Sequence, residues 1–126
     1  MPAASRGRAQ VVFDEAAWED DLRGATPAAR KVAKEARARL ERNGQPVDDL
    51  LVCDSNGADG TDLSGCAKAY IPPQVGPWGL VYLIAKDKRG RLYLDCLAFG
   101  ERHPPTGRQS SVYQIAHNRL HDRPQS

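Results

Sequence analysis

Residues 78–99 read WGLVYLIAKDKRGRLYLDCLAF, and they carry the clearest strand signals in the sequence. Residues 78–86 are nearly all apolar, which is typical of a central strand, and residues 92–99 form a second run of the same kind. Residues 87–90, Asp-Lys-Arg-Gly, are typical of a hairpin turn. The stretch therefore predicts two neighbouring antiparallel strands in the middle of a sheet.

The sheet extends toward the N-terminus. Residues 66–71 predict a third strand, and residues 10–13 predict a short edge strand. Residues 1–9 are small, polar and basic, so we expect a disordered tail. Residues 53–65 read as a solvated loop, because their acids do not follow the ligand spacing of a calcium-binding EF-hand.

Helical signals occupy the rest of the chain. Asp14 can cap a helix over residues 15–23, and Thr26-Pro27 opens a second helix over residues 28–42. Asn43-Gly44 and Pro46 end the second helix. The predicted apolar faces comprise Ala17, Trp18, Leu22, Val32, Ala33, Ala36 and Leu40.

A last helix is expected over residues 112–120, after a polar loop, with Ser110 or Ser111 as its cap. The resulting element order, β-α-α-β-β-β-α, predicts an α+β domain of two layers. An antiparallel sheet carries the helical hairpin on one face, and its other face stays partly open. We expect a single domain over residues 10–121 and a short tail over residues 122–126.

Composition and charge narrow the function. The 126-residue chain has no apolar run long enough to span a membrane, and no apolar segment follows its basic start. Its three cysteines show no CxxC spacing, which excludes a disulfide framework and favours buried thiols in a reducing cytoplasm. Residues 1–64 hold nine Lys and Arg against twelve Asp and Glu, whereas residues 65–126 hold nine against four. The basic second half suggests a polyanionic partner, although arginine codons of a GC-rich genome explain most of these residues equally well.

No nucleotide-binding or hydrolase motif is present. His117 and His121 lie four residues apart on the last helix, a spacing that can bind a metal, but no third ligand is evident. We therefore interpret them as surface histidines and expect neither a metal nor a cofactor.

A group of basic and aromatic residues remains that could carry chemistry. Cations stabilise the dianionic transition state when a 2′-hydroxyl attacks its own phosphate, and an acid and a base handle the protons. An alternative is that Tyr113 packs the last helix on the sheet and Arg102 is a solvated loop cation. The group comprises Lys68, Arg102, His103, Arg108, Tyr113 and Arg119.

Three stretches resemble the RelE/ParE superfamily of toxins from bacterial type II toxin–antitoxin pairs. Residues 10–22 (QVVFDEAAWEDDL) resemble its opening strand and first helix, and residues 66–82 (CAKAYIPPQVGPWGLVY) resemble its central strand pair. Residues 97–120 (LAFGERHPPTGRQSSVYQIAHNRL) resemble its most specific motif. The motif positions are Gly100, Arg102, Val112, Tyr113, Ala116, Arg119 and Leu120.

The resemblance implies a RelE-like fold and a toxin that cuts mRNA in the ribosomal A site, without a metal, by 2′-hydroxyl attack. It implies that Arg102 contacts the scissile phosphate, that Tyr113 activates the 2′-hydroxyl and stacks on a base, and that Lys68 is a strand cation near the phosphate. It also implies a cognate antitoxin as protein partner.

One position departs from the family pattern. Gly79 stands where the family has a phosphate-binding arginine. Arg89, Arg91 or Arg108 would have to replace that charge, and His103, in a lengthened loop, is the candidate base, unless it is simply solvated. The predicted RNA contacts are Lys86, Arg89, Arg91, Arg108 and Arg119. The departure leaves two alternatives open: a ParE-like toxin that acts on DNA gyrase, and an inactive member that binds a partner.

Overall fold

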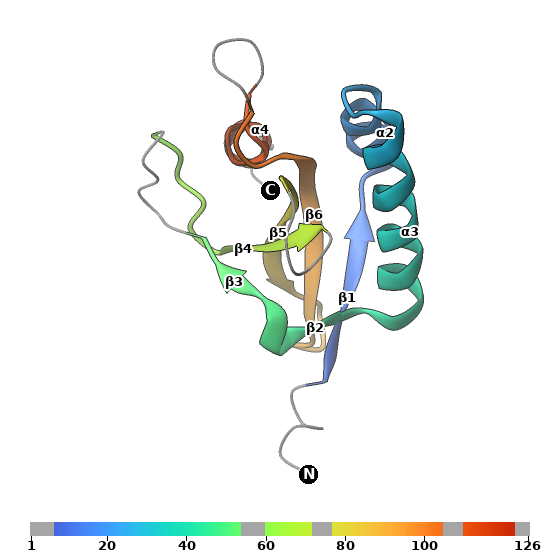
Figure 1. Ribbon diagram of the computed structural model, residues 1–126. Helices are drawn as coiled ribbons and strands as arrows, with labels where there is room; N and C mark the ends of the chain where they lie inside the picture. The colour runs from blue at the N-terminus through green and yellow to red at the C-terminus, as the bar shows by residue number, and fades with distance from the viewer. Residues whose placement is uncertain (1–6, 54–59, 72–76, 105–109, 123–126) are drawn as a thin grey trace.

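The computed structural model describes residues 7–53, 60–71, 77–104 and 110–122. These residues form a mixed α+β fold of one curled sheet and three α-helices (Figure 1). In chain order the elements are β1 (Arg8–Phe13), α2 (Glu15–Arg23), α3 (Pro27–Asn43), β2 (Gln45–Pro46), the 3₁₀ turn η1 (Val47–Asp49), β3 (Leu51–Val52), β4 (Cys66–Ile71), β5 (Trp78–Lys86), β6 (Leu92–Glu101) and α4 (Val112–His121).

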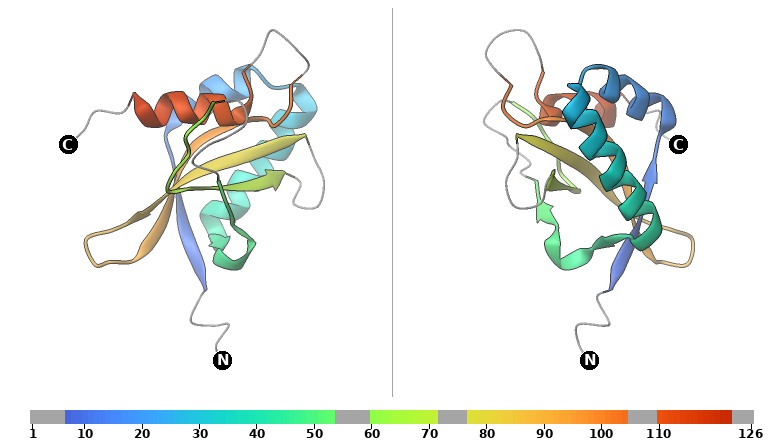
Figure 2. Two further views of the ribbon diagram at one scale, coloured as in Figure 1. Left: turned by 90° about the vertical axis from the view of Figure 1, so that its left-hand side faces the viewer. Right: turned by 45° about the vertical axis from the view of Figure 1, so that its right-hand side comes forward.

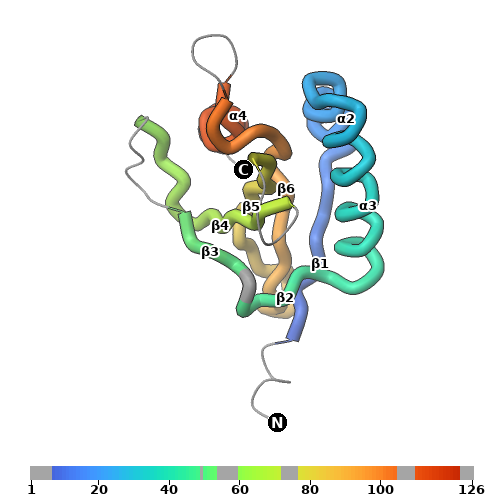
Figure 3. The backbone as a smooth tube through the Cα atoms, viewed as in Figure 1, coloured from blue at the N-terminus to red at the C-terminus, as the bar shows by residue number. Residues whose placement is uncertain are grey.

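The sheet has the strand order β2-β1-β6-β5-β4-β3. The β4-β5-β6 meander is antiparallel as predicted, but β1 runs parallel to β6 beside it (Figure 3). The predictions of an all-antiparallel sheet and of an edge position for β1 are therefore wrong. A tight turn dictates the direction of β6 against β5, whereas the paired residues of β1 and β6, such as Gln10 and Tyr93, are 83 positions apart, and no local signal encodes their pairing.

The strand ends also differ from the prediction. β1 begins at Arg8, and Ala9 is buried, so the predicted disorder is wrong for these two residues. β6 continues to Glu101, two residues further than expected. The reason is that β5 pairs along its full length, from Trp78 opposite Glu101 to Lys86 opposite Leu92.

Helices cover both faces of the sheet. The α2–α3 hairpin packs on one face around Trp18, Leu80 and Phe99, and α4 packs on the other around Val81 and Val112 (Figure 1). The hairpin agrees with the prediction. The second face is less open than predicted, because α4 lies across β5 and β6.

A β-bulge divides β6 between these two cores. Val81 lies opposite Ala98 while Tyr82 lies opposite Cys96, so Leu97 is the extra residue. Cys96 and Phe99 therefore face the hairpin, whereas Leu97 and Ala98 both face α4.

The helix ends confirm the capping signals. Asp14, Thr26 and Ser111 accept backbone N–H bonds as N-caps. Gly44 ends α3 with a φ of 73°, and a Cβ there would lie 2.7 Å from the Ala9 carbonyl oxygen. A glycine is thus required where the chain turns back beside β1.

Residues 45–52, for which no element was predicted, contribute β2, η1 and β3. In the predicted loop over residues 53–65, the described residues Cys53 and Leu63 are buried in the core beside α4 and Thr61 is buried, so this part is not merely solvated. All three cysteines are free and buried, as expected.

Candidate functional site

Two neighbouring strands present the first residues of the site. Lys68 lies opposite Val81, and Tyr70 lies opposite Gly79 in the β4–β5 ladder. Lys68 and Tyr70 are two residues apart on one strand, so their side chains share a face. This is the face that α4 crosses, and Gly79 continues it to its own cross-strand partner, Gly100.

Arg102 follows the end of β6 and joins this face to α4. Its Nε donates a hydrogen bond to Tyr113 Oη at 3.2 Å, and its guanidinium carbon lies 3.9 Å from the centre of the Tyr70 ring. Lys68 Nζ lies 5.4 Å from the centre of the Tyr113 ring. We call Lys68, Tyr70, Arg102 and Tyr113 the Arg102 cluster.

Gly79 leaves room on the sheet for the side chain of Arg102. A Cβ at Gly79 would lie 3.2 Å from Arg102 Cγ and 3.3 Å from the Ala69 carbonyl oxygen, closer than most real Cβ contacts. The aliphatic stem of Arg102 thus occupies the space above Gly79. The resembled family has an arginine at the position of Gly79. In this chain the aliphatic part of Arg102 fills the space beside that position.

The start of α4 places Tyr113. Ser111 and Gln114 form a reciprocal capping box, in which the Ser111 Oγ accepts the Gln114 N–H and Gln114 Oε1 accepts the Ser111 N–H. Val112 packs over Gly100, where a Cβ would be 3.5 Å from Val112 Cβ. The helix therefore begins directly above the sheet, and its second residue reaches Arg102.

The cluster combines two cations with two phenol rings, all half-buried. Because Arg102 Nε donates to Tyr113 Oη, the phenol's own proton is available for another acceptor. A guanidinium and an ammonium on one face suit a phosphate, and the phenol can donate to an oxygen bound to that phosphate.

Sequence reasoning brought Lys68, Arg102 and Tyr113 together correctly, but it missed Tyr70. The signal was available, because Tyr70 follows Lys68 at the strand period of two. His103 is exposed, and within the described residues it makes no hydrogen bond to the cluster.

Arg119, a predicted RNA contact, is instead a structural residue. Its guanidinium binds Asp21 on α2 through two bonds of 2.8 Å, and it also donates to the Leu97 carbonyl oxygen at 2.8 Å. Asp21, whose side chain is 5% exposed, also accepts the Phe99 N–H at 2.9 Å. The ion pair raises the pKa of Arg119 and satisfies the edge of β6 beyond its last pairing with β1.

The remaining predicted RNA contacts do not lie at the cluster. Lys86, Arg89 and Arg91 belong to the β5–β6 turn, whereas α4 lies at the other end of these strands (Figure 2, left). The nine residues of β5 span roughly 25 Å at about 3.3 Å per residue, so Arg89 and Arg91 cannot replace an arginine at Gly79. Arg108 lies outside the described residues.

The two histidines of α4 anchor a loop. His117 Nδ1 accepts the Asp62 N–H at 2.9 Å, and His121 Nε2 lies 3.0 Å from the Asp62 carbonyl oxygen. His117 is half-buried, so the surface interpretation holds for His121 alone. Among the described residues, no group of three or more His, Cys, Asp or Glu is arranged to hold a metal.

Comparison with protein-family models, with curated proteins and with solved structures finds no match. No helix in the described part of the chain is long and apolar enough to cross a membrane.

Proposed function

We propose that the protein is a metal-independent endoribonuclease, the toxin of a type II toxin–antitoxin pair, which cuts mRNA in the ribosomal A site in the cytoplasm. A cognate antitoxin is its protein partner. One observation carries the proposal: the Arg102 guanidinium lies between the Tyr70 ring and the Tyr113 hydroxyl, beside Lys68. The resemblance of residues 97–120 to the most specific motif of the toxin family also supports it.

In the proposed reaction, the 2′-oxygen attacks the adjacent phosphorus and the bond from phosphorus to the 5′-oxygen breaks. The products are a 2′,3′-cyclic phosphate and a 5′-hydroxyl. Arg102 and Lys68 stabilise the dianionic transition state. Tyr113, which the resemblance links to activation of the 2′-hydroxyl, instead donates its proton to the departing 5′-oxygen, because its hydroxyl accepts from Arg102 and keeps its own proton to donate. His103, adjacent to Arg102 in the chain, accepts the proton of the 2′-hydroxyl.

Gly79 favours a second candidate function. The cluster contains two cations without the arginine that the resembled nucleases have at this position, and a phosphate site loses affinity with each charge-assisted contact. A ParE-like toxin that acts on DNA gyrase, or an inactive member that binds a partner, needs no such set.

Primer extension on an mRNA bound to purified 70S ribosomes tests the proposal. Wild-type protein should produce a new cut within a codon, and Arg102→Ala and Tyr113→Phe should abolish it. Arg89→Ala, at the far end of β5 and β6, is the matched control and should cut normally. An uncut message with folded protein would overturn the proposal, and gyrase-dependent DNA damage on expression would then support the second candidate.

A further inference from the structure

Two of the three cysteines lie opposite one another at the edge of the sheet. β3 pairs with β4 so that Val52 is opposite Ala67, and the same antiparallel register, continued by one residue, places Cys53 opposite Cys66. The Cys53 N–H donates to the Cys66 carbonyl oxygen at 3.0 Å, in agreement with that register. Strand pairing therefore brings together two cysteines whose spacing in the sequence gives no such signal.

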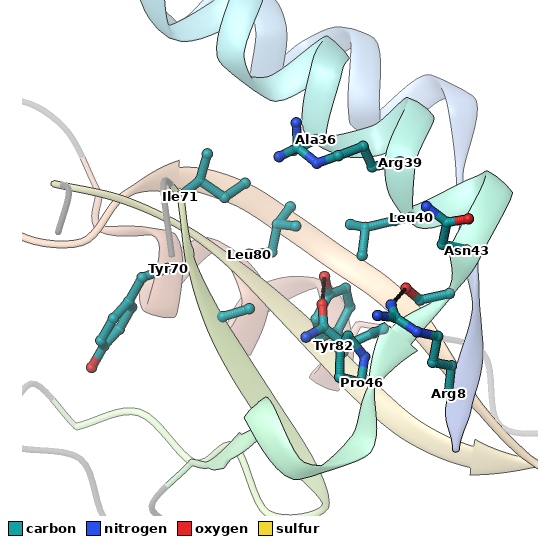
Figure 4. Close-up of a pocket in the computed structure, with 13 residues that line it drawn as sticks. Arg8, Ala36, Arg39, Leu40, Asn43, Pro46, Tyr70, Ile71, Leu80 and Tyr82 are labelled. Atoms are coloured by element: carbon teal, nitrogen blue, oxygen red, sulfur yellow. Dashed lines mark hydrogen bonds between the residues drawn. The ribbon is translucent and has the colours of Figure 1, made fainter. Parts of the chain in front are cut away.

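The two thiols point to the same side of the sheet. Directly opposite residues of antiparallel strands share a face, and Cys53 and Cys66 both belong to the core beside α4, next to Val81. The alternation along β4 agrees, because Ile71 points toward α3 whereas Tyr70 points away from it (Figure 4). Cys66 is four residues before Tyr70 on this strand and so lies on the same face.

The separation of the two cysteines suits a disulfide. Opposite residues of a hydrogen-bonded antiparallel pair have Cα atoms about 5.5 Å apart, and a disulfide accepts roughly 4.4–6.8 Å. Their Cβ atoms lie about 4.5–5.5 Å apart, against roughly 3.5–4.5 Å in a disulfide, so the bond requires an approach of about 1 Å. β3 can make this approach, because it has only two residues and lies at the end of the sheet.

The edge position also gives an oxidant access to one thiol. Leu51 and Val52 are both exposed, and a short exposed strand opens locally at little cost. Cys53 follows this strand directly and is 8% exposed, whereas Cys66 is 0% exposed. Cys53 is therefore the thiol that an oxidant reaches first.

The third cysteine is separated from this pair by the sheet. Cys96 lies in the core under the α2–α3 hairpin, and burial raises the pKa of its thiol. A thiol that stays protonated is a poor nucleophile. Cys96 therefore serves as the internal comparison for the pair.

We propose that Cys53 and Cys66 are a redox-sensitive pair that forms a reversible disulfide when the protein meets a low-molecular-weight disulfide such as glutathione disulfide. The Cys53 thiolate attacks one sulfur of the oxidant, which gives a mixed disulfide and releases one glutathione thiolate. The Cys66 thiolate then attacks the Cys53 sulfur and releases the second glutathione thiolate. The protein loses two electrons and two protons, which the two glutathione molecules take up. Cytoplasmic disulfides are usually transient and redox-sensing, and this one would tie the sheet edge two residues from Lys68.

Thiol mapping tests the proposal. The reduced full-length protein is equilibrated with mixtures of glutathione and glutathione disulfide, alkylated, and cut on the N-terminal side of each aspartate. Cys53 then lies in residues 49–53 and Cys66 in residues 62–86, so mass spectrometry finds the two peptides joined only if the bond has formed. We expect joined peptides for the wild type and for Cys96→Ala, the matched control, and dithiothreitol should separate them. Cys53→Ala and Cys66→Ala should give none, and Cys53→Ala keeps the test usable if the more deeply buried Cys66→Ala does not fold.

A second series in urea shows whether the fold holds the thiols together. At a fixed concentration of glutathione, the bond should form in folded protein at a roughly tenfold or more lower concentration of glutathione disulfide than in unfolded protein, because the strands orient the two sulfurs. Three results would overturn the proposal: folded wild type is alkylated at both cysteines in every mixture, the bond forms no more readily in folded protein than in urea, or Cys96 joins either peptide. All three are read from peptide masses, so the proposal stands or falls independently of RNA cleavage.

Discussion

Arg102 and Arg119 come from one sequence motif, yet the structure gives them opposite environments. Arg119 binds a carboxylate that is 5% exposed, and together they close the edge of β6. Arg102 lies beside the first turn of α4, against a phenol ring and a phenol hydroxyl. The first arginine binds a carboxylate on another helix, whereas the second contacts two aromatic residues.

Under the proposed function, this difference is the one between a structural arginine and an arginine that binds the substrate. In a buried bidentate ion pair, the N–H donors of the guanidinium are bound by groups of the protein itself. An aromatic ring and a phenol orient a guanidinium, and neither of these two contacts cancels its charge. Each of the following experiments tests that distinction.

The largest effect is expected for Arg119→Ala. It leaves the buried Asp21 carboxylate without its counter-charge, which typically costs about 3–5 kcal/mol of unfolding free energy. Urea unfolding measures the loss. The double variant Asp21→Ala with Arg119→Ala should lose less than the sum of the two single variants, because it leaves no charge unpaired. Additive losses would show that the pair is not coupled.

The next largest effect is expected for Arg102→Ala, which, unlike Arg119→Ala, should reduce activity and leave stability nearly unchanged. We expect the cleavage rate to fall about 100-fold or more, because a transition-state cation is removed. The free energy of unfolding should change by less than about 1 kcal/mol, since Arg102 is only half-buried. Arg102→Lys should keep part of the activity. A stability loss as large as that of Arg119→Ala would make Arg102 structural as well.

Some parts of the fold could be predicted from the sequence and others could not. The caps Asp14, Thr26 and Ser111 and the β4-β5-β6 meander were predictable, because turns and caps are encoded by neighbouring residues. The parallel pairing of β1 with β6 was not, because it depends on chain segments far apart in the sequence.

The same limit applies to the candidate site. Strand alternation and a motif placed Lys68, Arg102 and Tyr113, but residue type alone cannot distinguish Arg102 from Arg119. That distinction needs Asp21, a residue 98 positions away from Arg119. Likewise, the packing of the Arg102 stem on Gly79 comes from strand register and not from either residue.

Gly79→Ala is expected to have a smaller effect, which falls on the cluster. Its Cβ would crowd Arg102 Cγ at 3.2 Å, and the flexible stem can yield more easily than the Ala69 carbonyl at 3.3 Å. We expect about a tenfold slower cleavage with less than about 1 kcal/mol lost on unfolding. Gly100→Ala, its cross-strand partner, is the matched control, because its Cβ meets Val112 at an ordinary 3.5 Å. Equal effects of the two variants would contradict a specific role for Gly79.

The smallest effect is expected at Asp62, a half-buried carboxylate that, like Asp21, accepts a backbone N–H. Asp62 accepts bonds from the Ser64 hydroxyl and N–H, and these bonds lower the pKa of its carboxyl. Because the pKa is lower in the folded state, the stabilisation is present above about pH 4, the usual Asp range, and is lost as the pH falls through the folded value. Amide exchange at Ser64, corrected for intrinsic rates, should therefore keep its protection down to about pH 4 and lose it as the pH falls further, and Asp62→Asn should abolish that pH dependence. Simultaneous loss of protection at the Phe99 amide, which Asp21 binds, would show that the fold opens as a whole and that Asp62 alone is not responsible.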